Sequence, residues 1–318
     1  MLKSKLMALK KECFWSVDWG TSRVRIALVN RLEGSVSVRR DFDLGILALY
    51  QAWQKAGESS RIDFYLERLF ALFPETDIPN ARTFPTVISG MASASIGLKE
   101  LPYAQAPFSL TGQNIVSEWI REDVLLISGL QLGTELMRGE ETQCLGLDLA
   151  LEGTYCFLLP GTHSKHLLVD NQLIQSCHSV MTGEMYAILT KHSILRDSLA
   201  GNEAFDEVAF KAGLTQSKKK PLTANLFGIR SADLLKLRSP QSNADYLSGL
   251  LIGEECQILS SDKVVLVAGD SLRERYSLAI TYLNPEIELI CLPAEEANKL
   301  VIEGQRKILK NQIAPGLS

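Results

Sequence analysis

The chain of 318 residues lacks the short motifs of the commonest nucleotide-binding and hydrolytic sites. It contains neither G-x-x-x-x-G-K-[ST] nor G-x-G-x-x-G, so the sequence argues against P-loop and Rossmann sites. H-E-x-x-H and G-x-S-x-G are also absent, which removes the main support for a zincin or an α/β-hydrolase. A catalytic site in this chain must therefore be built from less common patterns.

Cysteine pairs, basic stripes and long apolar runs are missing as well. The six cysteines contain no C-x-x-C pair, which predicts neither a zinc site nor a disulfide framework and fits a reducing cytosol. The net charge is −4 and no basic stripe is present, so we expect no nucleic-acid partner. No apolar run approaches the roughly 20 residues that span a bilayer, and segment 6–9 is too short for a signal peptide. We expect a cytoplasmic protein without a membrane partner.

The hydrophobic pattern predicts two domains, 1–150 and 151–318. In the first half it predicts strands at 13–19, 24–29 and about 35–40, a helix at about 60–73, and strands at 86–89 and 124–128. In the second half it predicts strands at 154–159, 165–169 and 173–178, helices from 182, at 203–212 and at 243–260, a strand at 264–268, a helix at 271–283, a strand at 287–291 and a terminal helix at about 294–311.

The order β-β-β-α-β thus occurs twice, beginning near residues 13 and 154. A three-strand meander followed by α/β elements predicts an α/β protein with a duplicated ribonuclease-H-like fold, the actin-like ATPase fold. In that fold two domains flank a central cleft. The terminal helix could pack back on the first domain.

Two glycine-threonine turns occupy matching places in the two halves. Residues 18–22 (DWGTS) end the first strand, and residues 160–164 (PGTHS) follow the first strand of the second half. Glycine lets the backbone approach a phosphate, and nearby amides and hydroxyls donate to its oxygens. Asp18 could hold Mg²⁺ directly or through water. We predict that both turns bind the phosphates of one ATP, with His163 as a phosphate donor or a structural histidine; either turn alone also fits a plain hairpin.

The segment 137–143 (MRGEETQ) carries the candidate base. A sugar hydroxyl that attacks phosphorus benefits from a carboxylate that accepts its proton. The segment is similar to the Gly-Asp-Gln stretch that supplies this base in sugar kinases of the actin-like superfamily. We predict Glu140 as the base, with Glu141 as the alternate or as a magnesium partner. Arg138 could neutralise an acidic substrate; a solvated charged loop is the alternative reading.

Two further segments follow predicted buried strands, where ligands of α/β proteins collect. Residues 89–97 (SGMASASIG) offer small side chains and hydroxyls that suit a sugar pocket or a tight strand-to-helix connection, and Tyr103 could close such a pocket. Gly269 and Asp270 open a predicted helix, which is a natural place for adenosine contacts. Gly249 could serve either helix packing or adenine binding.

With these stretches the chain resembles the 2-dehydro-3-deoxygalactonokinase family, small sugar-acid kinases of the actin/hexokinase/Hsp70 superfamily. The resemblance rests on DWGTSRVR at 18–25, SGMASASIG at 89–97, LPY at 101–103, MRGEETQ at 137–143, PGTHSKH at 160–166, MTGEMYAIL at 181–189 and GLLIGEE at 249–255. It implies phosphorylation of the 6-hydroxyl of 2-dehydro-3-deoxy-D-galactonate by ATP and Mg²⁺ in galactonate breakdown.

From the motifs and the resemblance together we expect two groups of site residues. Phosphate or nucleotide contacts are expected from Asp18, Gly20, Thr21, Ser22, Gly161, Thr162, His163, Ser164, Gly269 and Asp270. Substrate contacts are expected from Trp19, Arg25, Gly90, Met91, Ser93, Tyr103 and Arg138. The chain departs from the family pattern at Ser22-Arg23, where a Thr-Asn-like pair is commoner, and at His166, where an aromatic residue is expected.

Three alternatives remain at the level of sequence. The chain could phosphorylate another sugar or sugar acid, which a substrate screen would reveal. It could hydrolyse phosphoanhydrides like an exopolyphosphatase, and phosphate would then be released without a sugar acceptor. It could also bind ATP without turnover, as a regulatory protein.

Overall fold

The computed structural model describes residues 12–74, 78, 81–147, 152–200 and 204–313. These residues form two compact units. The first unit lies within Met1–Leu151, Gln172–Gln175 and Asn298–Ser318, and the second lies within Glu152–Asn171 and Ser176–Ala297. The predicted domain boundary at 150/151 falls outside the described residues.

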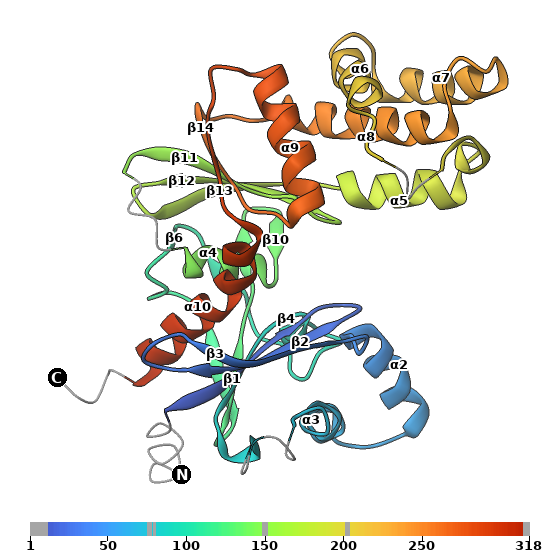
Figure 1. Cartoon of the computed structure of the whole chain (residues 1–318). Coiled ribbons are helices and arrows are strands. Elements are labelled where there is room, and N and C mark those ends of the chain that lie inside the picture. The colour runs from blue at the N-terminus through green and yellow to red at the C-terminus, as the bar shows by residue number, and fades with distance from the viewer. Residues whose placement is uncertain (1–11, 75–77, 79–80, 148–151, 201–203, 314–318) are drawn as a thin grey trace. The chain divides into compact units, whose positions relative to one another are not determined.

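The sheet of the first unit begins as a meander (Figure 1). Strand β1 (Cys13–Trp19) pairs antiparallel with β2 (Val24–Asn30), and β2 pairs antiparallel with β3 (Val36–Phe42). On its other side β1 runs parallel to β4 (Thr86–Gly90), which runs parallel to β8 (Val124–Ile127). With β7 (Ser117–Arg121) at the edge, the strand order is β3-β2-β1-β4-β8-β7.

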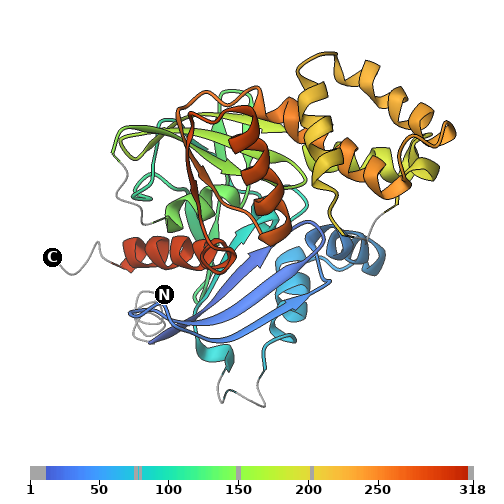
Figure 2. The same cartoon turned by 45° about the horizontal axis from the view of Figure 1, so that its top comes forward.

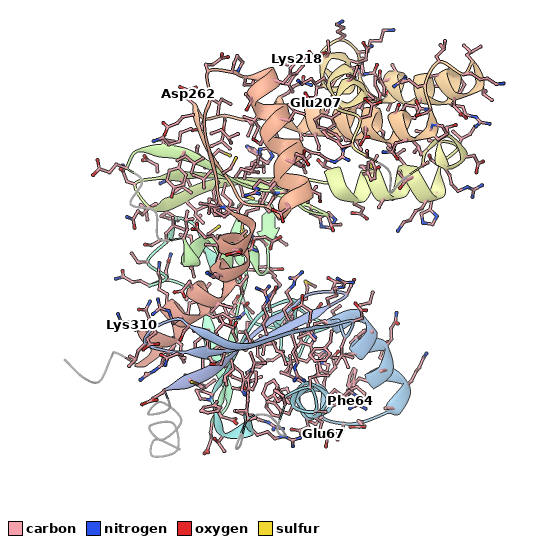
Figure 3. All side chains as sticks on the ribbon, in the orientation of Figure 1. Phe64, Glu67, Glu207, Lys218, Asp262 and Lys310 are labelled. Carbon is pink, nitrogen blue, oxygen red and sulfur yellow. The ribbon has the colours of Figure 1, made fainter. Side chains whose placement is uncertain are left out.

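Helices α2 (Ile46–Ala56) and α3 (Arg61–Phe70) provide much of the core against this sheet. The N-cap Ser60 accepts a hydrogen bond from the amide of Asp63, which satisfies one of the donors at the start of α3. Phe64 is buried on this helix while Glu67 is exposed, and Figure 3 labels both. The amphipathic pattern of residues 61–70 thus decides which face of α3 packs inward.

Short elements complete the first unit: 3₁₀ turns η1 (Ala81–Thr83) and η2 (Met91–Ser93), strands β5 (Ala104–Gln105), β6 (Phe108–Ser109), β9 (Leu130–Leu132) and β10 (Glu135–Met137), and helix α4 (Glu140–Gly146). The last helix, α10 (Ala294–Ile313), belongs to this unit from Asn298 onward. Its Gln305 Nε2 donates to the carbonyl of Val17 at 2.9 Å and to Ser89 Oγ at 2.8 Å. Helix α10 therefore hydrogen-bonds to the two central strands, β1 and β4.

The second unit repeats the arrangement. Strand β11 (Thr154–Leu159) pairs antiparallel with β12 (Ser164–Asp170) and parallel with β14 (Lys263–Leu266), which runs parallel to β15 (Glu288–Cys291). Strand β13 (Leu173–Val180) lies beside β12, so these five strands follow the order β15-β14-β11-β12-β13. The first sheet contains the order β3-β2-β1-β4-β8, and the second contains the equivalent order β13-β12-β11-β14-β15. If these five strands of each sheet are numbered along the chain, both orders are 3-2-1-4-5. This confirms the predicted duplicated ribonuclease-H-like fold.

The helices of the second unit are α5 (Thr182–His192), α6 (Glu207–Ser217), α7 (Leu222–Leu234), α8 (Pro240–Cys256) and α9 (Asp270–Leu283), with a 3₁₀ turn η3 (Arg196–Ser198). Figures 1 and 2 show α6, α7 and α8 grouped together. A Cβ on Gly249 would lie 2.1 Å from the carbonyl oxygen of Phe210. Gly249 therefore serves the close packing of α6 and α8.

The structure differs from the sequence prediction in its helices. The helix predicted at 203–212 spans Glu207–Ser217, and the sequence does not predict α2 or α7. The N-cap of α2 is Gly45, which provides no capping side chain, so the usual start signal is missing. Across the part of the chain that the structure describes, no helix is both long and apolar enough to cross a bilayer.

Candidate active site

The first glycine-threonine turn joins β1 to β2 and lies on the start of α2. The Gly20 amide donates to the carbonyl of Arg23 at 2.8 Å, which closes the turn. The carbonyls of Gly20 and Thr21 accept from the amides of Ile46 and Leu47 at 3.1 and 3.2 Å. Thr21 and Ser22 are exposed, so their hydroxyls are available to a ligand.

Asp18 stands at the end of β1, directly across from Arg25 in the strand register. Arg25 Nη1 donates to Asp18 Oδ2 at 2.8 Å, and the Asp18 side chain keeps 22% of its surface exposed. The other oxygen, Oδ1, lies on the side of Gly90, 3.4 Å from where a Cβ on that glycine would be. Asp18 therefore offers one oxygen toward Gly90 while an arginine balances its charge.

Two glycines with positive φ bring the candidate base segment close to Asp18. Gly90 has φ +88° and Gly139 has φ +113°, values that L side chains rarely adopt. A Cβ on Gly90 would lie 2.8 Å from the carbonyl oxygen of Trp19, and one on Gly139 would lie 3.6 Å from Gly90 Cα. The structure therefore gathers Asp18, Gly90 and the start of the Glu140 helix in one place within the first unit.

The two candidate bases differ in environment. Glu140, the first residue of α4, is partly exposed, and its Oε2 accepts from the Arg138 amide at 3.2 Å. Glu141 is fully buried and accepts from the Gly139 amide at 2.7 Å and from Thr142 Oγ1 at 2.9 Å. Burial, and then the charge of Glu140, raise the pKa of Glu141 to about 8. Of the two carboxylates, Glu140 can reach a substrate and Glu141 closes the start of its own helix.

Arg138 is held by a dense set of contacts. Its Nη1 donates to the carbonyl and the hydroxyl of Ser93 at 2.7 and 2.8 Å, and its Nε donates to Tyr103 OH at 3.0 Å. The guanidinium also lies over the Tyr103 ring, 4.0 Å from its centroid. Ser93 is fully buried, and Arg138 and Tyr103 are partly exposed. Of the predicted substrate residues, Ser93, Tyr103 and Arg138 thus form one connected cluster in which Ser93 positions the arginine.

Trp19 does not fit its predicted place among the substrate contacts. Its side chain is fully buried in the core, and Nε1 donates to the carbonyl of Leu44 at 2.8 Å. The ring packs near Tyr65, with centroids 6.2 Å apart. A buried indole whose N–H is already hydrogen-bonded leaves no surface for a ligand, so Trp19 is a core residue next to the turn.

The second glycine-threonine turn lies between β11 and β12 and packs on the start of α5. The Glu184 amide donates to the carbonyl of Thr162 at 3.0 Å, and a Cβ on Gly183 would lie 2.4 Å from the carbonyl oxygen of Gly161. His163 Nε2 lies 2.6 Å from Glu184 Oε2, and both side chains are exposed. Thr162 is exposed, and beyond the two chain neighbours of Gly161 no atom of the described residues lies within 4 Å of a Cβ on that glycine.

Ser164 is fully buried, so its predicted contact with phosphate is replaced by a structural one. Its hydroxyl lies 3.2 Å from Tyr276 OH and 3.4 Å from the Gly161 amide. Ser164, predicted from the sequence as a phosphate ligand, therefore stabilises the turn instead.

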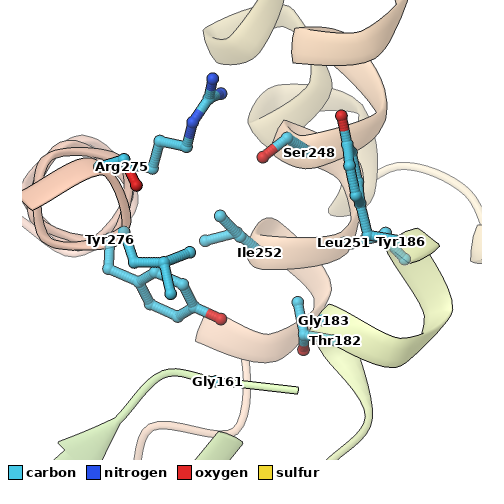
Figure 4. Close-up of a pocket in the computed structure, with 11 residues that line it drawn as sticks. Gly161, Thr182, Gly183, Tyr186, Ser248, Leu251, Ile252, Arg275 and Tyr276 are labelled. Atoms are coloured by element: carbon cyan, nitrogen blue, oxygen red, sulfur yellow. The ribbon is translucent and has the colours of Figure 1, made fainter. Parts of the chain in front are cut away.

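A cavity of about 290 Å³ extends from this turn between α5, α8 and α9. Figure 4 shows Gly161, Thr182 and Gly183 at one end and Tyr186, Ser248 and Arg275 at the other. Leu251 and Ile252 are among the apolar residues of its lining. An apolar cavity with polar groups at both ends suits a nucleoside whose phosphates reach Gly161.

Arg275 at the far end is oriented by the protein itself. Its Nη1 donates to Asp245 Oδ1 at 2.7 Å, and its guanidinium lies 4.4 Å from the Phe205 ring centroid. Asp245 is buried, so this ion pair fixes the arginine at the cavity wall.

Gly161, a predicted phosphate contact, lines this cavity, whereas the other predicted nucleotide residues do not. Gly269 and Asp270 are exposed at the start of α9 and are absent from the lining, while the next residue, Ser271, belongs to it. Tyr186, Ser248 and Arg275 are not predicted. Tyr186 and Ser248 lie in or next to the family stretches at 181–189 and 249–255, which was the available signal.

Comparison with known proteins decides the family. The sequence profile of the family described as 2-keto-3-deoxy-galactonokinase matches residues 18–307. The chain belongs to this family. The match begins at Asp18 and includes both glycine-threonine turns and the Glu140 segment.

Individual family members show the same relationship. A 2-dehydro-3-deoxygalactonokinase of Escherichia coli K12 is 33% identical over 218 residues, which cover 65% of this chain and 73% of the relative. DgoK1 of Rhizobium meliloti 1021, named as a candidate for the same activity, is 29% identical over 83% of this chain and 88% of its own length. A crystal structure of a candidate 2-dehydro-3-deoxygalactonokinase from Sinorhizobium meliloti superposes with a TM-score of 0.77 at 26% identity, covering 96% of this chain and 98% of that one.

The described residues contain no cluster of three or more histidine, cysteine, aspartate or glutamate side chains arranged to hold a metal ion. That finding concerns a metal held by protein ligands alone. Mg²⁺ in phosphoryl-transfer sites commonly takes one or two carboxylates and completes its shell with phosphate oxygens and water. Asp18, with one oxygen turned toward Gly90, fits that second type of site.

Proposed function

We propose that this chain transfers the γ-phosphoryl group of ATP to the 6-hydroxyl of 2-dehydro-3-deoxy-D-galactonate in galactonate catabolism, in the cytoplasm. The observation that carries the proposal is the family match over residues 18–307, which includes every polar residue proposed for the chemistry. The names of the relatives supply the substrate and the type of reaction.

Glu140 is the proposed general base. A base must reach the hydroxyl proton, and the partial exposure of Glu140 allows this while the full burial of Glu141 does not. Gly90 and Gly139 let the Glu140 segment lie close to Asp18, because neither glycine carries a Cβ that would separate the two backbones. Arg138, fixed by Ser93 and Tyr103, supplies a positive charge for the carboxylate of the sugar acid.

The cavity of the second unit is the proposed nucleoside site. Its polar end at Arg275 would contact the adenine base of ATP, and its other end at Gly161 would contact the phosphates. The exposed residues of this turn, Thr162 and His163, would donate to phosphate oxygens. That the turn at 18–22 serves the same triphosphate stays a prediction.

Mg²⁺ would be held by Asp18 together with phosphate oxygens, where it would neutralise charge that develops during transfer. Arg25 supports Asp18 in this role because its ion pair orients the carboxylate. Thr21 and Ser22 would orient the phosphates from the same turn.

The test is incubation of the purified chain with ATP, Mg²⁺ and 2-dehydro-3-deoxygalactonate, with ADP release followed by a coupled assay. The phosphorylated position of the product would be assigned by ³¹P and ¹H NMR. We expect ADP only when the sugar acid is present, and a 6-phosphate as product. Phosphate release without an acceptor would support a phosphohydrolase instead, and turnover of a different sugar acid alone would correct the substrate.

A further inference from the structure

Helix α8 carries a buried carboxylate that has no part in the proposed chemistry. The Glu255 side chain is 0% exposed, yet it faces three donors. Its Oε1 lies 2.9 Å from His166 Nε2, and its Oε2 accepts from Tyr276 OH at 2.7 Å and from Thr182 Oγ1. A carboxylate without water is stable only when such donors replace its hydration, so these bonds fix its surroundings.

The three donors come from three different elements around the cavity. His166 lies on β12, Thr182 is the first residue of α5, and Tyr276 lies on α9. Thr182 and Tyr276 line the cavity end that contains Gly161. One carboxylate therefore ties together the strand and the two helices that frame this end.

The connection continues to the turn itself. Tyr276 OH lies 3.2 Å from Ser164 Oγ, and that oxygen lies 3.4 Å from the Gly161 amide. The start of α5 touches the turn again through the Glu184 amide, which donates to Thr162 at 3.0 Å. A shift of Glu255 would thus move the backbone of residues 161 and 162 by two routes.

We propose that Glu255 is a positioning residue for the nucleotide phosphates: it holds Thr182, Tyr276 and Ser164 so that the turn at 160–164 keeps the geometry that binds ATP. The inference rests on the proposed nucleotide site. His166 holds one oxygen of this carboxylate from β12 through its Nε2, 2.9 Å from Oε1, and among the described residues its Nδ1 has no partner. Neither Glu255 nor His166 lines the cavity.

The test compares Glu255→Gln, His166→Leu and His166→Gln by ATP binding, measured by calorimetry without the sugar acid, and by steady-state kinetics. For Glu255→Gln and His166→Leu we expect the Kd and KM for ATP to rise roughly 10-fold, because small displacements of a binding group have large effects. The KM for the sugar acid should change less than the KM for ATP. His166→Gln, which keeps a donor, should recover part of the loss.

Asn225→Leu is the matched control. Asn225 is a buried polar residue on α7 that bonds to Gln216 and Lys220 and does not line the cavity. Its replacement should lower the Tm but leave the ATP affinity unchanged. A lowered Tm with unchanged ATP affinity in Glu255→Gln or in His166→Leu would overturn the inference. If Glu255→Gln does not fold, the ATP affinity of His166→Leu provides the test. A wild-type chain that binds no ATP would remove the proposed function, and this inference with it.

Discussion

The two glycine-threonine turns have similar sequences but different supports. The first turn follows Asp18, whose charge Arg25 balances, and it lies on the start of α2. In the second turn Leu159 and Pro160 stand at the matching positions and carry no charge, and the turn lies on the start of α5 with Ser164 buried. The first turn is therefore the one that can provide a metal ligand, and the second is the one joined to an apolar cavity.

The two turns share a glycine-threonine motif, but their different surroundings suggest different roles for the two units. Metal binding and proton transfer are expected in the first unit, near Asp18 and Glu140. Nucleoside binding is expected in the second unit, near Gly161 and Arg275. Substitutions in the first unit should therefore lower kcat, and substitutions in the second should raise the KM for ATP.

The largest effect is expected from Glu140→Gln. Without the carboxylate that accepts the hydroxyl proton, kcat should fall by roughly 10²–10⁴-fold while the KM for ATP changes little. Steady-state kinetics with ATP and the sugar acid measure both constants. Glu141→Gln is the neighbouring control and should retain far more activity. Full activity in Glu140→Gln with loss in Glu141→Gln would shift the base by one residue.

A smaller loss is expected from Asp18→Asn. The amide is a poor metal ligand, so kcat should fall on the order of 10–100-fold and the Mg²⁺ concentration needed for half-maximal rate should rise. A Mg²⁺ titration of the rate measures this. Asp41→Asn is the control, because Asp41 lies 3.7 Å from Arg25 on the neighbouring strand and has no proposed metal contact. Equal Mg²⁺ dependence in both variants would remove Asp18 from the metal site.

Gly45→Ala and Gly183→Ala compare the supports of the two turns directly. A Cβ at Gly45 would lie 2.1 Å from the Thr21 carbonyl oxygen, and one at Gly183 would lie 2.4 Å from that of Gly161. Each substitution should destabilise the chain by about 1–3 kcal/mol in chemical denaturation. Gly183→Ala should also raise the Kd for ATP, by roughly 10-fold, and by more than Gly45→Ala, because the second turn is the one joined to the proposed nucleoside cavity.

Gly228→Ala is the control for both glycine variants, because, apart from the adjoining backbone of α7, no atom of the described residues lies within 4 Å of a Cβ at that position. It should keep the stability of the wild type or exceed it slightly. An unchanged ATP affinity in Gly183→Ala would separate the second turn from nucleotide binding.

The smallest expected effect concerns pH and Glu141. Its pKa is raised to about 8 in the folded chain from an ordinary 4.5, so between these values the folded state binds a proton that the unfolded state does not. The stability that comes from this proton is complete below pH 4.5 and is lost as the pH rises through about 8. In Glu141→Gln the Tm should depend less on pH over this interval. Parallel Tm curves for the two proteins would contradict the raised pKa.

The fold was largely predictable because its signals are local. Strand alternation and glycine turns mark the meanders at 13–30 and 154–170, and the repeated order of elements then specifies the topology. The starts of the helices were less predictable where the signal is weak. Gly45, which begins α2 without a capping side chain, is an example.

The candidate site was predictable in its residue types and less so in their exposure. Trp19 and Ser164 belong to ligand-like stretches, yet both are fully buried. The contrast between Glu140 and Glu141 arises because successive residues of α4 face different directions, which the letters Glu-Glu do not reveal. The cavity combines side chains from α5, α8 and α9, and no local pattern in the sequence records that they meet.

The return of α10 to the first unit means that neither unit is a single stretch of the chain. Gln305 donates to Val17 and Ser89, and a Cβ on Gly304 would lie 1.9 Å from the Thr142 carbonyl oxygen. A fragment that ends near residue 151 would lose this helix and expose to water the surfaces of β1, β4 and α4 that α10 contacts. Expression of isolated halves would therefore fail for the first, whereas fusing residues 298–313 to residues 12–147 through a short linker should restore it.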